Sequence, residues 1–197
     1  MQSLVLLVFL IGAIIAIAWL VLNPRPPAFW LDSLSLSGLP NASDASSAPR
    51  ELSVRIQLTA TNPNTKFLVV IQEVNPCLAL SPGKCQLPLS THDNTSSSEY
   101  YISKRGRRTF DVIAGPRPGR RTSRKRPFQF AVGKDLRKGS AAMSLRMQVS
   151  VKFMHAYWPS KRTTVEVGCE DLSVGLSSST ISGKLEDGGK DCSVRFA

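Results

Sequence analysis

The sequence has few of the residues on which most enzymes depend for proton transfer. Its 197 residues include only two histidines, His92 and His155, and histidine is the side chain that most often exchanges a proton near neutral pH. It contains no G-x-S-x-G nucleophile motif and no phosphate-binding G-x-x-x-x-G-K-[ST] motif. No pair of carboxylates stands apart from the solvated acids. We therefore expect a protein that is not an enzyme and that holds no cofactor and no metal.

Charge is missing from one long segment near the start of the chain. Residues 4–22 contain no Asp, Glu, Lys or Arg, and as a helix they would rise about 28 Å, close to the hydrocarbon thickness of a bilayer. The sequence Asn-Pro-Arg-Pro-Pro at residues 23–27 would end that helix. We therefore predict a tail of residues 1–3, followed by a single transmembrane anchor over residues 4–22 in contact with the lipid bilayer.

Signal-peptide cleavage is the alternative for the same segment. Ala16 and Ala18 have the spacing of a signal-peptidase site, and cleavage after Ala18 would release a secreted, basic protein that binds polyanions. Two observations favour the uncleaved anchor. No Lys or Arg precedes the segment, and the apolar run continues beyond Ala18.

Sequons and cysteines favour a location outside the cytosol for the rest of the chain. Asn41 and Asn94 each begin an N-x-S/T sequon and are glycosylation candidates. The four cysteines form an even set, which is typical of domains in oxidising compartments. We therefore predict a single-pass protein, in the plasma membrane, whose C-terminal domain lies outside the cytosol.

The cysteine spacing allows three disulfide connectivities. We favour Cys77 with Cys85 and Cys169 with Cys192, because the Ser-Pro-Gly turn over residues 81–83 would bring the first two thiols together. Four buried free thiols are the alternative. A zinc site is disfavoured, because neither pair has the short spacing of a zinc knuckle.

Helical periodicity is missing after residue 22, where apolar and polar residues alternate instead. Between residues 143 and 157 this alternation has the period of a half-buried strand. Shorter candidate strands cover residues 29–36, 52–58, 67–71, 110–114, 128–132, 165–169 and 194–196.

Because no helices separate these strands, a parallel sheet would have no cover on its faces. The pattern predicts an all-β protein with an antiparallel β-sandwich over residues 50–197, similar to immunoglobulin and fibronectin type III domains. A juxtamembrane segment over residues 23–49 would supply a first strand and a loop.

Positive charge is concentrated in one part of the chain. The net charge is +11, and residues 104–126 hold ten basic residues against one acid, Asp111. The ten are Lys104, Arg105, Arg107, Arg108, Arg117, Arg120, Arg121, Arg124, Lys125 and Arg126. One interpretation is a solvated connecting loop. The other is a patch that binds anionic lipid or acidic cell-wall polysaccharide. Nucleic acid is an unfavoured partner, because few aromatic side chains lie among the basic ones.

A short turn sequence carries a resemblance to a known family. The alternating strand ends in Asn62-Pro63-Asn64, residue types that suit a turn. This ending, the preceding apolar segment and the late strands around Cys169 and Cys192 resemble the plant late-embryogenesis-abundant group 2 domain, in particular its harpin-induced, disease-resistance-related membrane branch. The resemblance implies a role in plant defence or stress response, with an unknown protein partner. The sequence departs from the family in its basic cluster and in residues 1–3, which stand where the family has a basic tail.

Overall fold

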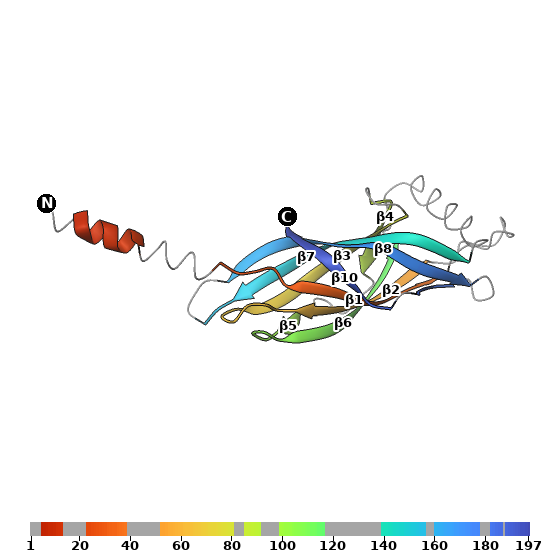
Figure 1. Cartoon of the computed structure of the whole chain (residues 1–197), viewed down its shortest axis with the longest axis horizontal. Helices are drawn as coiled ribbons and strands as arrows, with labels where there is room; N and C mark the ends of the chain where they lie inside the picture. The colour runs from red at the N-terminus through yellow and green to blue at the C-terminus, as the bar shows by residue number, and fades with distance from the viewer. Residues whose placement is uncertain are drawn as a thin grey trace.

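The computed structural model describes residues 5–13, 23–38, 52–80, 85–91, 99–116, 139–156, 160–177, 182–186 and 188–197. Within these residues ten β-strands belong to one sheet. They are β1 (Ala28–Ser37), β2 (Ser53–Thr61), β3 (Leu68–Ala79), β4 (Leu87–Thr91), β5 (Tyr100–Ile102), β6 (Arg107–Pro116), β7 (Ser140–Met154), β8 (Lys161–Ser177), β9 (Ser182–Leu185) and β10 (Lys190–Phe196). Figure 1 shows them wrapped around a common axis.

The sheet closes on itself through its last strand. The hydrogen-bonded order is β10-β1-β2-β6-β4-β3-β7-β8, and β8 pairs again with β10. In the described part of the chain, eight strands therefore form an antiparallel barrel. β10 pairs with β1 over residues 190–192 and with β8 over residues 193–196. β9 bridges β8 and β1 farther along the same seam, and β5 pairs with β3.

The predicted β-sandwich is therefore wrong, although antiparallel strands form at the predicted places within the described residues. In a sandwich and in a barrel alike, every strand has one buried and one exposed face. Alternation along the sequence thus cannot distinguish the two folds. The deciding strand is β10, and its pairing with both β1 and β8 closes the ring. The alternation indicated residues 194–196 of this strand and the family resemblance a strand around Cys192, but neither indicated its two partners.

The predicted transmembrane helix is also corrected. The structure describes helix only over residues 5–13 of the expected segment. Among the described residues, no helix is both long enough and apolar enough to cross a bilayer. Residues 4 and 14–22 lie outside the described part.

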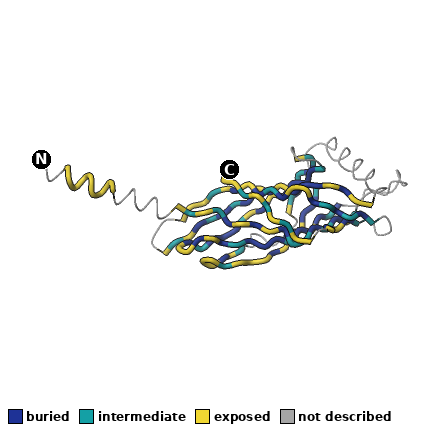
Figure 2. Tube along the Cα trace, viewed as in Figure 1, coloured by how far each residue is buried: buried dark blue, intermediate teal, exposed yellow. Residues whose placement is uncertain are grey.

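The inward faces of the strands fill the barrel with apolar side chains. On β7 every second residue from Met143 to Phe153 is buried, apart from a shift in register between Met143 and Leu145. These side chains join one hydrophobic cluster to which all the long strands contribute. Figure 2 shows buried and exposed positions alternating along the strands. Each fully buried Leu, Ile, Val or Phe contributes about 1.5–3 kcal/mol, so this cluster is the main source of stability.

Several elements differ from the sequence prediction. β4, β5 and β9 were not predicted, because β4 contains Pro88, β5 has three residues and β9 is rich in polar residues and Gly. β1 lies within the sheet between β10 and β2, whereas the sequence placed it ahead of the domain. The candidate strand over residues 128–132 lies outside the described residues.

Candidate functional site

The Asn-Pro-Asn motif forms a buried hydrogen-bond network at one end of the barrel. The Asn62 side chain is fully buried, and its Nδ2 donates to the carbonyl oxygens of Phe67 at 2.8 Å and Ser103 at 3.0 Å. Its Oδ1 accepts from the backbone N–H and the Nδ2 of Asn64, at 3.0 and 2.9 Å. The motif thus joins the end of β2, the start of β3 and the β5–β6 turn.

Asn64 extends this network to the segment that precedes β1. Its Oδ1 accepts the N–H of Arg25 and its Nδ2 donates to the Arg25 carbonyl, both at 2.8 Å. The Asn64 carbonyl accepts the N–H of Arg105 at 3.1 Å. The N-terminal chain therefore joins the barrel at the end that carries the β5–β6 turn, the left end in Figure 1.

Exposed basic side chains gather at this end of the barrel. We term six of them the basic end: Arg25, Lys66, Lys104, Arg105, Arg107 and Lys161, all exposed. The Asn62–Asn64 network brings the first five together. Lys161 begins β8 opposite Phe153, near the end of β7. The described ion pairs Arg55–Asp111 and Arg146–Glu170 involve none of the six. A surface of ammonium and guanidinium groups of this kind attracts anions.

The basic cluster predicted over residues 104–126 is divided by β6. Its first four members lie in the β5–β6 turn and at the start of β6. Of these, Arg108 stacks over the Tyr100 ring at 5.6 Å and donates to the Tyr101 carbonyl at 3.2 Å. The other six members lie outside the described residues: Arg117, Arg120, Arg121, Arg124, Lys125 and Arg126. The single basic loop is therefore corrected to a turn followed by a strand.

Sequence reasoning missed three members of the basic end. Arg25 and Lys66 are isolated basic residues in the sequence, and Lys161 has only Arg162 beside it. Tertiary contacts bring all three to the same end as the predicted cluster. The Asn62-Pro63-Asn64 motif was the one available signal, and the sequence indicated for it only a structural turn.

One carboxylate lies near the basic end and is already hydrogen-bonded. Glu99 accepts the Tyr101 hydroxyl at 2.5 Å and the Gln72 Nε2 at 2.7 Å. These bonds hold the pKa of Glu99 below its usual range, with smaller contributions from Lys152 and Arg162. The same hydroxyl bond raises the pKa of Tyr101.

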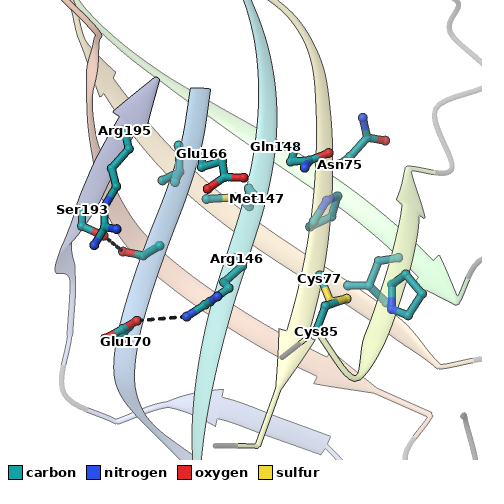
Figure 3. Close-up of a pocket in the computed structure, with 15 residues that line it drawn as sticks. Asn75, Cys77, Cys85, Arg146, Met147, Gln148, Glu166, Glu170, Ser193 and Arg195 are labelled. Carbon is teal, nitrogen blue, oxygen red and sulfur yellow. Dashed lines mark hydrogen bonds and ion pairs between the residues drawn. A yellow bond between two sulfur atoms is a disulfide. The ribbon is translucent and has the colours of Figure 1, made fainter. Parts of the chain in front are cut away.

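A shallow groove crosses the outer face of β3, β7, β8 and β10 (Figure 3). Its volume is about 440 Å³, and Gly168, which has no side chain, lies beside Arg146 on the neighbouring strand. Arg146 pairs with Glu170 at 3.4 Å, and Arg195 lies opposite Glu166 in the strand register. Because its two arginines are matched by two glutamates, the groove does not accumulate charge of one sign as the basic end does.

The four cysteines form two disulfides, Cys77–Cys85 and Cys169–Cys192, which is the pairing favoured from the sequence. The first joins β3 to the residues before β4 and borders the groove. The second links β8 to β10 where the barrel closes. Its Cα–Cα distance of 4.4 Å is that of a directly opposed, non-hydrogen-bonded pair in an antiparallel sheet.

The remaining candidates are the sequon asparagines, the two histidines and possible metal ligands. The sequon residues Asn41 and Asn94 lie outside the described residues, as does His92. His155 packs its ring against Phe67 at a centroid distance of 5.5 Å. In the described part of the chain, no three His, Cys, Asp or Glu side chains lie close enough to hold a metal ion.

Neither a protein family, nor a curated protein, nor a solved structure matches this chain. The resemblance to the late-embryogenesis-abundant group 2 domain therefore rests on its short motifs and stays a prediction. The choice of the basic end as the candidate functional site therefore rests on its geometry and charge alone.

Proposed function

We propose that this chain is a non-catalytic binding protein whose domain works outside the cytosol and binds anionic partners through its basic end. Its setting, as the family resemblance implies, is plant defence or stress response at the plasma membrane. The contact of residues 4–22 with the bilayer remains a prediction.

The observation that carries the proposal is the six exposed cations gathered at one end of the barrel. Like charges held together repel one another and reduce stability unless an anion matches them. Here the buried Asn62 and Asn64 side chains fix the backbone that carries five of the six. A surface with such fixed charges is already arranged for an anionic partner, which lowers the entropy cost of binding.

The disulfides support the proposed compartment. Disulfides persist in oxidising compartments and are rare in the cytosol, and all four cysteines of this chain are paired. Neither bridge lies at the basic end, which fits a role in holding the fold.

Binding to a soluble polyanion tests the proposed function. The full chain, in mild detergent, is expected to bind immobilised polygalacturonate, and the binding should weaken as salt rises. Changing Arg25→Gln, Arg105→Gln and Arg107→Gln together should reduce the affinity about tenfold, because each exposed ion pair contributes up to about 1 kcal/mol.

The matched control removes the same charge elsewhere on the barrel. It combines Arg55→Gln, Arg146→Gln and Lys190→Gln, three basic residues outside the basic end. Equal losses in the two triple variants would reduce the effect to net charge and contradict a localised site.

Protease protection tests the compartment separately. A C-terminal tag on the chain should resist trypsin in sealed microsomes and should be digested after detergent is added. Endoglycosidase should shift the mobility of the wild type but not that of a variant lacking Asn41 and Asn94. Digestion of the tag in intact microsomes would place the domain in the cytosol and refute the proposal.

A further inference from the structure

We infer that the anionic partner of the basic end is the surface of a lipid bilayer, on which the barrel stands with this end towards the head groups. The inference rests on the proposed function, because it names the partner of the same site.

The first argument is the position of the basic end relative to the apolar segment of the chain. Residues 4–22 join the barrel through residues 23–27, whose backbone is bound by Asn64 at Arg25. Five residues span at most about 17 Å, and Pro24, Pro26 and Pro27 restrict them further. The barrel end nearest the apolar segment is therefore the end that carries the six cations.

The second argument is the mixture of apolar and basic side chains at this end. Phe196 and Met154 are 49% and 38% exposed. Phe196 lies opposite Val165 near the start of β8, and Met154 lies opposite Leu68 at the start of β3. Exposed apolar groups among cations suit the boundary between head groups and acyl chains, whereas a polysaccharide offers no acyl phase for them. This observation favours lipid over acidic cell-wall polysaccharide.

The third argument is the backbone conformation of Arg105. Its φ angle is +54°, a left-handed conformation that glycine adopts easily and that strains a residue with a Cβ. The turn over residues 103–106 thus contains a charged residue where glycine would relieve strain. Strain of this kind is retained where function requires the side chain.

The experiment measures where the full chain is covered when vesicles are added. The chain is mixed with vesicles of phosphatidylcholine alone, or with vesicles in which phosphatidylserine makes up about one third of the lipid. Lysine acetylation rates are then read by mass spectrometry. Lys66, Lys104 and Lys161 report on the basic end, and the exposed Lys184, on β9 at the other end of the barrel, is the internal reference.

Phosphatidylserine should slow acetylation of the three basic-end lysines relative to Lys184, because side chains held against the head groups are shielded from the reagent. Salt near 1 M, where the screening length is about 3 Å, should remove the effect. Vesicles of phosphatidylcholine alone should protect the three lysines less. Equal protection of all four lysines, or of none, would overturn the inference.

Variants test whether the basic end carries the docking, and one of them, Phe196→Ser, separates lipid docking from anion binding in general. Combining Arg25→Gln, Arg105→Gln and Arg107→Gln keeps the reporter lysines and should abolish their protection by phosphatidylserine, whereas the control triple variant at Arg55, Arg146 and Lys190 should keep it. Phe196→Ser should weaken protection by vesicles and leave polygalacturonate binding unchanged.

The outcomes also distinguish this inference from the proposed function. A wild-type chain that binds neither polygalacturonate nor phosphatidylserine vesicles contradicts both. A chain whose basic-end lysines are protected by polygalacturonate but not by vesicles keeps the proposed function and makes acidic polysaccharide the partner.

Discussion

Asn64 binds both backbone groups of Arg25, a residue 39 positions earlier in the chain, through its own side-chain oxygen and nitrogen at 2.8 Å each. Pro24, Pro26 and Pro27 have no backbone N–H, so the Arg25 N–H is the one backbone donor between residues 24 and 27. By binding it, Asn64 fixes the direction in which the N-terminal chain leaves the barrel.

Replacing Asn64 should loosen that attachment. Asn64→Ala removes both bonds to Arg25 and leaves Asn62 Oδ1 with one fewer donor. We expect the free energy of unfolding to fall by about 2 kcal/mol, as for other buried polar groups left without partners. Urea denaturation measures the loss, and hydrogen exchange should be faster at the Arg25 amide. Thr65→Ala, at an exposed neighbouring position, is the control and should change stability by less than about 0.5 kcal/mol. Unchanged protection of the Arg25 amide would refute the attachment.

The disulfide at the barrel seam should matter more than the one in the β3–β4 hairpin. Cys169–Cys192 has a sequence separation of 23, and Cys77–Cys85 one of 8. In the chain-entropy description these loops give about 3.4 and 2.5 kcal/mol respectively. Removing each bridge with paired Cys→Ala changes, and comparing denaturation midpoints with the wild type, should give the larger loss for the seam. A larger loss for the hairpin pair would show that loop length does not set the relative contributions of the two bridges.

The local alternation of apolar and polar residues predicted the strands of this fold better than it predicted how the sheet closes into a barrel. The period-two alternation of β7 survives in the structure because one of its faces packs against the core throughout. Closure depends on β10, whose first residues include Lys190 and Asp191 and show no apolar alternation. Their pairing with β1 is a tertiary contact, and no local propensity encodes it.

The candidate site was only partly visible in the sequence for the same reason. Lys104, Arg105 and Arg107 stand together in the chain, so local charge density revealed them. Arg25 and Lys161 reach the same barrel end through strand pairing across the whole chain. The sequence also grouped residues 117–126 with the first cluster, because the charges were counted along the chain although a strand over residues 110–114 was predicted among them. In the structure that strand, β6, runs from Arg107 to Pro116.

The bond between Glu99 and Tyr101 should be visible in the titration of both groups. It lowers the pKa of Glu99 and raises that of Tyr101. For Glu99, the stabilising contribution is present above its unfolded pKa and is lost as the pH falls through its folded pKa. For Tyr101, it is present below the unfolded pKa and is lost as the pH rises through the folded pKa.

Tyr101→Phe isolates this bond. The Glu99 pKa, followed by carboxyl NMR, should rise towards its usual value, although the remaining Gln72 bond should keep it lower. The Glu166 carboxylate, on the outer face of β8, provides a reference resonance. A Glu99 pKa that does not move in Tyr101→Phe would mean that the hydroxyl does not bind the carboxylate in solution.

Arg105 offers a test in which stability and binding change in opposite directions. The N–H of Gly106 donates to the Ser103 carbonyl at 2.9 Å and closes the turn in which Arg105 has its positive φ. Arg105→Gly relieves strain of about 1–2 kcal/mol but gives the unfolded chain extra freedom worth about 0.5–1 kcal/mol. Stability should therefore rise by about 0.5–1 kcal/mol, while affinity for phosphatidylserine vesicles should fall about fivefold with the loss of one basic residue.

Arg105→Gln is the matched control, because it removes the charge and keeps the strain. Its vesicle affinity should fall as far as that of Arg105→Gly, while its denaturation midpoint should remain at the wild-type value. If Arg105→Gly gained stability and bound vesicles as tightly as the wild type, the strained conformation would have no connection with anion binding. If Arg105→Gln were as stable as Arg105→Gly, the gain would come from relieved charge repulsion at the basic end instead of from the backbone.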